Sequence, residues 1–579
     1  MKHFYPLFVF LFLSGTVSAQ IFFEERASQL GLDDTSYGNG ILGGGVSFFD
    51  FDNDGWDDIT MATEDGSLIR LFKNNEGVFE EVSLNITDHA HQSKTVQWVD
   101  INNNGLYDLF ITHDNAPNRL YKNLGNMIFE DITMSSGLFD DNHISFGASW
   151  GDVNNDGFLD VFIASRNVSD PTEHNLLFLN NGDETFTDIT VSAGLHLENK
   201  YSFCVAFFDY DKDGFQDIYI ANDKFDTANI LYKNNGDNTF TDVSAVSGTD
   251  VIIDAMSTTI DDYNNDGWLD IYITNTPTGN VFYKNNGDGT FTDVAVQTGT
   301  TFDSVGWGAV FLDADHDGHK DLYVVGEVFD SPSLKSSAFY HNNGDGTFSI
   351  PTNSGIFDEE SRSFANAIGD INNNGHPDIA VLNFSPFDMY LWENQSTTTH
   401  NWLKVKLEGT ESNRQGIGSW IEISVNGEKQ HNYTLLGEGF LGQNSSYEFF
   451  GIGESASIDY VKVTWLSGIV DYIENPAINE HMTIVEGEHI LSADTFISIN
   501  KKVSLFPNPS KDFATLKLPD FYDLEKTRIL IKNSLGQEIE QFEPKMLAFE
   551  INTSNYKTGI YFCIINSPQG QETLKLIKQ

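Results

Sequence analysis

Short apolar segments separated by polar turns recur through residues 20–396 in a constant order. In each unit a segment rich in Gly and small residues, such as 147–151, precedes a polar loop, and a β-branched and aromatic segment, such as 217–220, follows such a loop. A further pair of apolar segments encloses an Asn-Gly turn, as in residues 231–243. The pattern predicts repeating units of four β-strands.

The polar loops set the period of the repeat. Their starts lie roughly 50 to 57 residues apart, which is the period of a four-stranded propeller blade. The last unit lacks its fourth strand, whereas residues 23–32 resemble the fourth strand at 186–195. We therefore predict an all-β fold in which the N-terminal strand completes the last blade of a closed, seven-bladed β-propeller, because a closed ring leaves no sheet edge open.

Each loop follows one nine-residue pattern of oxygen-bearing side chains. Positions 1 and 9 are Asp, positions 3 and 5 are Asp or Asn, and position 6 is Gly in all seven copies. Ca²⁺ takes about six to eight oxygen ligands, which alternate residues of such a loop supply. We predict up to seven Ca²⁺ ions, one per blade. The predicted ligands are Asp50, Asp52, Asp54 and Asp58; Asp100, Asn102, Asn104 and Asp108; Asp152, Asn154, Asp156 and Asp160; Asp209, Asp211, Asp213 and Asp217; Asp262, Asn264, Asp266 and Asp270; Asp313, Asp315, Asp317 and Asp321; and Asp370, Asn372, Asn374 and Asp378.

The loops can be compared with two other structures, the EF-hand and the metal-free Asx turn. An EF-hand needs a Glu at position 12 between two helices, but position 12 is apolar in all seven copies and lies in a strand-like segment. Metal-free Asx turns, in which Asp and Asn bond their own backbone, remain the alternative. If ligand charge sets affinity, the loops from Asp50, Asp209 and Asp313, with four carboxylates each, bind Ca²⁺ most tightly, and those from Asp100 and Asp370, with two, most weakly.

Residues 1–19 have the pattern of a secretory signal peptide. Lys2 precedes the apolar run 4–13, and the small residues 17–19 form a cleavage site before Gln20. The run is too short to span a bilayer, and no later segment is long enough to do so. We expect an exported mature protein that begins at Gln20 and has no transmembrane segment.

Charge and cysteine content narrow the partners further. The net charge of -53 argues against nucleic acid or anionic lipid as a partner. The two cysteines, Cys204 and Cys563, are expected to be buried free thiols. An exported protein without disulfides needs another source of stability, and bound calcium would provide it.

The loops and the Gly- and Ala-rich strands before them resemble the FG-GAP (VCBS-type) repeats that build the seven-bladed propeller of integrin α subunits. The resemblance covers residues 20–396. In that family the side chains at positions 1, 3, 5 and 9, with the backbone carbonyl at position 7, hold Ca²⁺. The resemblance implies a calcium-binding extracellular module of the kind used in cell adhesion.

Two small, β-sandwich-like domains are expected after the propeller. Residues 401–403, 412–418, 450–453 and 465–468 resemble the ASPIC/UnbV domain, which would span 397–492 before a linker at 493–500. Residues 506–510, 534–537, 557–561 and 574–578 resemble the C-terminal sorting domain of type IX secretion substrates, which would span 501–579. That resemblance implies a Bacteroidetes-type bacterium, export by the type IX machinery to the outer-membrane surface or the medium, and removal of the domain on arrival.

No catalytic motif stands out. The chain has no His-Glu-x-x-His, no P-loop and no clustered Cys/His site. His89, His91, His143 and His174 are scattered singly and are interpreted as loop or surface residues, and Arg414 as a surface salt-bridge residue. We predict a monomeric, non-enzymatic adhesion or binding module for a protein or glycan ligand. The alternative is a polysaccharide lyase or hydrolase, because a pair of catalytic carboxylates would not stand out among so many Asp and Glu residues.

Overall fold

The computed structural model describes most of the chain. The described residues are 20–87, 90–138, 143–170, 172–224, 226–328, 331, 334–356, 361–489, 503–506, 510–511, 513–518, 522, 524, 526–534, 536–567 and 570–578. The predicted signal peptide at 1–19, the predicted linker at 493–500 and His89 lie outside them. In the described part, no helix is long and apolar enough to span a bilayer.

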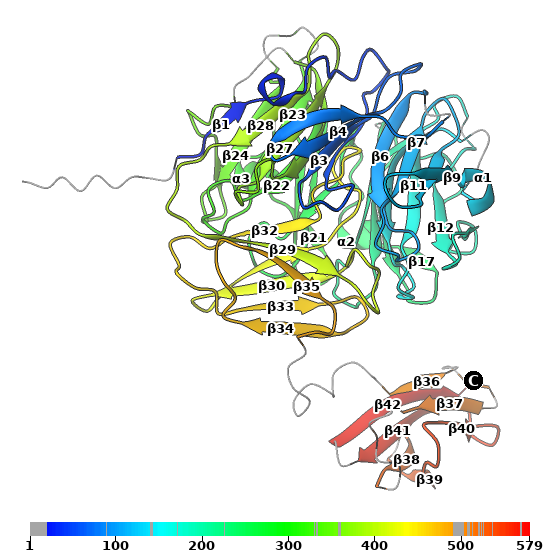
Figure 1. Cartoon of the computed structure of the whole chain (residues 1–579). Helices are drawn as coiled ribbons and strands as arrows, with labels where there is room; N and C mark the ends of the chain where they lie inside the picture. The colour runs from blue at the N-terminus through cyan, green and yellow to red at the C-terminus, as the bar shows by residue number, and fades with distance from the viewer. Residues whose placement is uncertain are drawn as a thin grey trace, which may run out of the picture. The chain divides into compact units, whose positions relative to one another are not determined.

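Seven four-stranded antiparallel sheets make up the repeat region (Figure 1). Their strands are β2 (Val46–Phe49), β3 (Asp58–Met61), β4 (Arg70–Asn75) and β5 (Val78–Val82); β6 (Ser93–Val99), β7 (Asp108–His113), β8 (Arg119–Asn123) and β9 (Phe129–Asp131); β10 (Ser145–Gly151), β11 (Asp160–Ser165), β12 (Leu176–Asn180) and β13 (Phe186–Asp188); β14 (Ser202–Phe208), β15 (Asp217–Asn222), β16 (Ile230–Asn234) and β17 (Phe240–Asp242); β18 (Thr259–Asp261), β19 (Asp270–Ile273), β20 (Val281–Asn285) and β21 (Phe291–Asp293); β22 (Val305–Leu312), β23 (Asp321–Glu327), β24 (Ser337–Asn342) and β25 (Phe348–Ser349); and β26 (Ser363–Gly369), β27 (Asp378–Asn383), β28 (Tyr390–Asn394) and β1 (Phe23–Glu25). Short helices, η1 (Ser28–Leu30), α1 (Thr133–Ser136), α2 (Ser244–Ser247) and α3 (Ala295–Thr298), follow four of the outermost strands. The predicted all-β class is confirmed, and the number of sheets equals the number of predicted blades.

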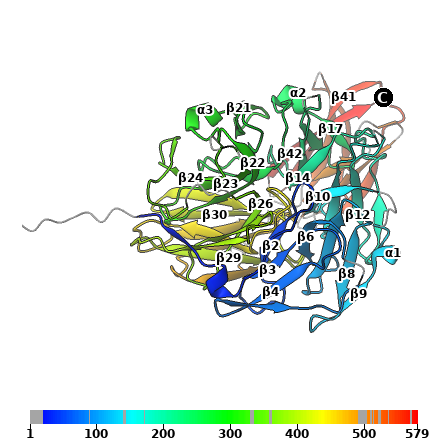
Figure 2. The ribbon, with the colours of Figure 1, turned by 90° about the horizontal axis from the view of Figure 1, so that it is seen from above.

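The first strands of the sheets are neighbours in a cycle that runs from β2 to β26 and back to β2 (Figure 2). Strands such as β6, β10 and β14 are buried along their whole length, because other sheets pack on both of their faces. This crowding explains the glycines of the first strands. A Cβ atom on Gly151 would lie 2.8 Å from Cγ of Phe207 in β14.

The N-terminal strand completes the last sheet, as predicted. Phe23 of β1 pairs with Asn394 of β28 in antiparallel register. The neighbouring Phe22 donates its backbone N–H to the hydroxyl of Ser396, which lies 374 residues further along the chain. The chain thus closes the ring with its own beginning.

Residues 397–489 form two sheets that pack as one unit with the propeller (Figure 1). One sheet has the order β32-β29-β35 and the other β31-β30-β33-β34. The strands are β29 (Trp402–Glu408), β30 (Trp420–Val425), β31 (Glu428–Tyr433), β32 (Tyr447–Gly451), β33 (Tyr460–Thr464), β34 (Val470–Glu474) and β35 (His481–Val485). Their alternating apolar residues, including Leu403, Ile421 and Val461, form a separate core between the sheets. We call this region the second domain.

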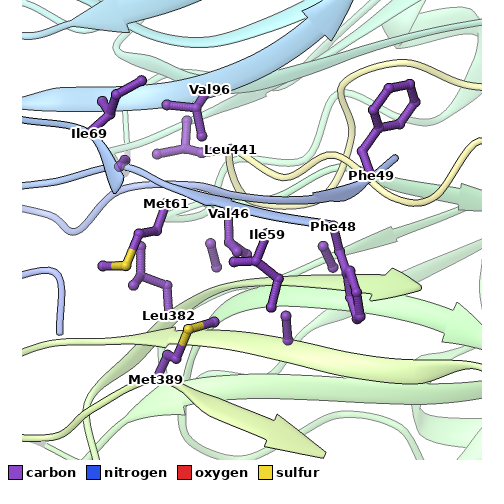
Figure 3. Close-up of a cluster of buried hydrophobic side chains, with 14 of the residues drawn as sticks. Val46, Phe48, Phe49, Ile59, Met61, Ile69, Val96, Leu382, Met389 and Leu441 are labelled. Carbon is purple, nitrogen blue, oxygen red and sulfur yellow. The ribbon is translucent and has the colours of Figure 1, made fainter. Parts of the chain in front are cut away.

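Residues 434–445, in the connection between β31 and β32, enter the centre of the propeller, and we call this segment the plug. Leu436 bridges Trp150 of β10, Gly439 bridges Thr258 before β18, and Gln443 bridges Ser47 of β2. Leu441 joins the hydrophobic cluster around β2 and β6, as the close-up of Figure 3 shows. A segment of the second domain therefore fills the middle of the ring, which the sequence did not lead us to expect.

The C-terminal unit has two sheets, β36-β37-β40 and β39-β38-β41-β42. Its strands are β36 (Ser504–Phe506), β37 (Phe513–Lys517), β38 (Arg528–Asn533), β39 (Glu538–Phe542), β40 (Ala548–Asn552), β41 (Gly559–Ser567) and β42 (Gly570–Lys578). Cys563 lies in its core, and Cys204 lies in the core of the propeller. Both thiols are free and buried, as predicted, and burial raises the pKa of each to about 12.

Candidate functional site: the acidic loops

Each acidic loop connects the first strand of a sheet to the second. In the loop between β2 and β3, Asp50 accepts hydrogen bonds from the backbone N–H groups of Asp54 (3.0 Å) and Gly55 (2.9 Å). Both bonds recur in the other six loops. The glycine at position 6 has φ between 81° and 91° in every copy, which only glycine adopts without strain. Position 1 therefore builds an Asx-type turn in each loop.

The aspartate at position 9 begins the second strand and is held by backbone groups from two sides. Asp58 accepts hydrogen bonds from the N–H groups of Phe51 (3.1 Å) and of Asn74 in β4 (2.7 Å). The bond from a third-strand asparagine is present in all seven sheets. Burial raises the pKa of Asp58 to about 9 despite these bonds. The position-9 residues, predicted only as ligands, also hold the loop against the sheet.

In three of the loops, position 3 supplies an oxygen that lacks a hydrogen-bond partner, and in the loop from Asp262 the oxygen Oδ2 of Asp270 at position 9 does so. One carboxylate oxygen (Oδ1) of Asp52, of Asp211 and of Asp315 is buried and accepts no hydrogen bond. These are equivalent atoms in the three loops that carry four carboxylates. In each of these loops three acidic side chains have oxygens within 4.8 Å of one another: Asp50, Asp52 and Asp58; Asp209, Asp211 and Asp217; and Asp313, Asp315 and Asp317. Buried, unpaired anionic oxygens held together in this way fit a hard divalent cation.

A third-strand residue that sequence reasoning missed contacts the acidic loop of its own sheet in five of the seven sheets. It precedes the asparagine that bonds to position 9, so the Lys-Asn pair present in four of the seven strands was its signal. Lys73 contacts Asp52 and lies 2.8 Å from Asp54, and Lys233 contacts Asp211 and lies 2.8 Å from Asp213. The residues at this place are Lys73, Lys122, Leu179, Lys233, Lys284, His341 and Glu393. The carboxylate count alone therefore overstates the charge of the loops that a lysine faces.

Position 4, also missed, links six of the seven loops to the next one. Asn53 has φ of 61° and donates from its amide nitrogen to the carbonyl of Gly105 in the following loop (3.1 Å). Five further loops make the equivalent link, and the one from Asn373 to Gly55 closes the cycle. Lys212 stands at this place in the fourth loop, and its ammonium lies over the rings of Trp268 (4.6 Å) and Trp420 (4.7 Å) instead. In five of the seven loops the signal was an Asn, which tolerates positive φ, before the Asp-Gly or Asn-Gly pair; Lys212 and His316 stand there in the other two.

The second domain contacts all seven loops. Lys404 Nζ lies 2.9 Å from Asp370 Oδ2, and His431 Nδ1 lies 3.1 Å from Asp262 Oδ2. The other loops are reached by Lys406, Arg414, Glu411, Trp420 and Gly453. Arg414 uses its backbone N–H for this contact, and its half-exposed guanidinium pairs with Glu408, as predicted. The loop face of the propeller is thus an internal interface.

Two histidine pairs differ from the prediction that these residues are isolated. The rings of His143 and His174 meet edge to face with centroids 6.5 Å apart. The rings of His91 and His113 do the same at 5.5 Å. All three of the predicted histidines that the structure describes are only partly exposed, because other parts of the chain cover them.

Three known families match successive parts of the chain. Residues 50–111, 100–163, 152–220, 209–273, 262–324 and 328–381 match the FG-GAP-like repeat. Residues 409–490 match the ASPIC and UnbV family, and residues 504–579 match the secretion system C-terminal sorting domain. The sorting domain marks the protein for type IX secretion to the cell surface or the extracellular space.

Among individual proteins, cartilage acidic protein 1 of Homo sapiens is 25% identical over 367 residues, covering 55% of this chain and 52% of the human protein. The Mus musculus protein is 25% identical over 363 residues, covering 55% of this chain and 53% of its own length. The chain therefore spans about half the length of these curated relatives. The extracellular domain of a hybrid two-component system from B. thetaiotaomicron matches with a TM-score of 0.39 and 13% identity, covering 96% of this chain and 73% of that one. That likeness is too distant to bear on function. Since the repeats span more than half of the chain, the protein belongs to the FG-GAP-like repeat family.

Proposed function

We propose that this secreted protein is a calcium-stabilised propeller that binds an extracellular protein or glycan ligand without acting on it as an enzyme. The observation that supports calcium best is the unpartnered position-3 oxygen beside other carboxylates in the loops from Asp50, Asp209 and Asp313. Calcium bound there would give these buried oxygens a partner, and in the loops from Asp50 and Asp209 it would compete with the ammonium of Lys73 or Lys233. The residues that would hold it are those at positions 1, 3, 5 and 9.

The ligand surface follows from the position of the second domain. Because neighbouring strands are antiparallel, the connections between second and third strands lie at the end of each sheet opposite the acidic loops. The second domain contacts the acidic loops, so within residues 20–489 we assign ligand binding to the opposite face. Leu68 and Val168, which are 57% and 63% exposed, lie on such connections.

Calcium is expected to raise the melting temperature of the protein, and chelation to lower it. A site that binds only the folded state stabilises it by about 2.7 kcal/mol when free calcium is 100 times Kd. Asp213→Ala removes an anionic ligand from a four-carboxylate loop, whereas Asn104→Ala removes a neutral one from a two-carboxylate loop. Thermal melts of both variants with calcium and with chelator should show the larger loss of calcium-dependent stabilisation for Asp213→Ala. A wild-type melt indifferent to chelation would refute the metal assignment, and equal losses would refute the ranking by charge.

Ligand binding is expected to depend on the face opposite the loops. An array of matrix proteins and glycans, probed with the protein in calcium, identifies a binder. Leu68→Asp and Val168→Asp should then each weaken binding at least tenfold, because a carboxylate replaces an exposed apolar contact. The matched control is Leu124→Asp, since Leu124 is 53% exposed but lies on the connection between β8 and β9, at the same end of its sheet as the acidic loop. Equal effects of all three substitutions would rule out this face, and turnover of the bound glycan would rule out a non-enzymatic role.

A further inference from the structure

We propose that the sixth loop, from Asp313 to Asp321, together with His341 of β24, binds a divalent first-row transition metal that accepts an imidazole ligand, such as Zn²⁺. This proposal does not rest on calcium binding by the other loops. It rests on a comparison between two loops of one chain. The loops from Asp209 and Asp313 carry aspartate at all four ligand positions, and they differ in the third-strand residue that faces them, Lys233 or His341.

In the loop from Asp209, an ammonium occupies the space between the carboxylates. Lys233 contacts Asp211, and its Nζ lies 2.8 Å from Asp213 Oδ2. A lysine ammonium has donors but no lone pair, so it competes with a metal ion and cannot bind one. Lys73 has the same place in the loop from Asp50.

In the sixth loop, an imidazole replaces that ammonium. Asp315, Asp321 and His341 each offer a ligand atom, and these atoms lie within 4.8 Å of one another. His341 Nδ1 is 2.9 Å from Asp321 Oδ1. Asp315 is only 5% exposed, and its buried Oδ1 accepts no hydrogen bond. One unsatisfied anionic oxygen, a second carboxylate and a nitrogen donor therefore converge on one place.

The surroundings hold these ligands in position. Asp321 accepts hydrogen bonds from the backbone N–H groups of Asn342 (2.8 Å) and Ala314 (3.1 Å), which fix its carboxylate. Two nearby histidines are engaged elsewhere. His316 Nε2 lies 3.1 Å from the carbonyl of Gly375, and His400 Nδ1 lies 2.7 Å from the carbonyl of Asp315. Among the described residues, His341 is the histidine whose ring nitrogen is grouped with the carboxylates of Asp315 and Asp321, within 4.8 Å of both.

The donor set selects the class of metal. Calcium and magnesium prefer oxygen ligands alone, whereas imidazole suits zinc, copper, iron and nickel. A nitrogen donor should therefore add affinity for Zn²⁺ and little for Ca²⁺. The sixth loop differs from its six counterparts in this respect, because none of the other third-strand residues is a histidine.

The test uses the full-length protein, freed of metal by chelation and titrated calorimetrically with Zn²⁺ in the presence of millimolar Ca²⁺. Wild type is expected to bind one Zn²⁺ that calcium does not displace. His341→Lys, which installs the residue of the equivalent strand, should weaken that binding at least tenfold. Lys233→His should create a second calcium-resistant Zn²⁺ site. His341→Gln provides a variant without the added charge, and melting curves establish that each variant is folded.

Zinc K-edge absorption of the loaded wild type should show scattering from one imidazole, which His341→Lys and His341→Gln should both lose. Unchanged zinc affinity in these two variants, or a zinc spectrum without imidazole, would overturn the proposal. If calcium does not stabilise the protein but zinc binds as expected, only the proposed calcium function is overturned. If calcium stabilises the protein but zinc does not bind, only this site is overturned.

Discussion

Phe440→Ala is expected to lower the free energy of unfolding of the unit formed by residues 20–489 by about 3–5 kcal/mol. Phe440 belongs to the plug and is fully buried. Its ring centroid lies 5.0 Å from that of Trp307 and 5.8 Å from that of Phe203, two residues of first strands in different sheets. Truncation leaves a cavity in the middle of the ring, and the surrounding sheets limit how far the site can collapse.

Urea unfolding followed by tryptophan fluorescence and by circular dichroism measures this loss. Both probes should shift together, because the plug joins the second domain to the propeller. The control is Val296→Ala, whose exposed side chain should change stability by less than about 0.5 kcal/mol. A loss below about 1 kcal/mol for Phe440→Ala, or a shift confined to one probe, would show that the plug is not part of a shared core.

In calcium-free buffer, Lys404→Ala should also destabilise strongly, by about 3–5 kcal/mol, because it leaves the carboxylate of Asp370 buried without a counter-charge. Both side chains are almost fully buried, and Lys404 Nζ also lies over the ring of Tyr447 at 4.6 Å. The pair joins the second domain to the seventh acidic loop. Its removal therefore weakens the interface as well as the charge balance.

Lys429→Ala is the matched control for this effect. Lys429 lies in the same domain and pairs with Glu422 at 3.1 Å, but its side chain is 51% exposed. Exposed ion pairs contribute about 0–1 kcal/mol. Chemical unfolding should separate the two variants, and Lys404→Ala/Asp370→Asn should regain part of the loss. A Lys404→Ala variant no less stable than Lys429→Ala would refute the buried-pair account.

The repeat could be predicted from the sequence because each unit contains its own local pattern. The Asp-x-Asp/Asn-x-Asp/Asn-Gly loops and the apolar segments on either side are local patterns, and the missing fourth strand had one visible replacement at residues 23–32. Local patterns therefore sufficed to predict the all-β repeat and the pairing of β1 with β28.

The contacts between the second domain and the ring could not be predicted, because they do not follow from local sequence patterns. The plug is rich in glycine and has no helical or strand period, so nothing in it indicated burial. Lys404 lies at an alternate position of an otherwise typical strand, where a lysine normally faces solvent. Its partner Asp370 lies 34 residues earlier, in another domain. The third-strand lysines were missed because their role depends on pairing across a sheet rather than on spacing.

The pairing of β1 with β28 also sets the order in which the molecule can be finished. Because a chain is synthesised from its N-terminus, β1 is made first. Its partner strand β28 ends just before Ser396, which lies 374 residues after Phe22. Until β28 has been synthesised, β1 has an unpaired edge. The middle of the ring stays unfilled for longer, because the plug follows β28 in the chain. Such long-range closure is slow and prolongs the time during which edges can pair wrongly. We therefore expect that β1 must be protected from wrong strand pairing during folding until the second domain has been synthesised.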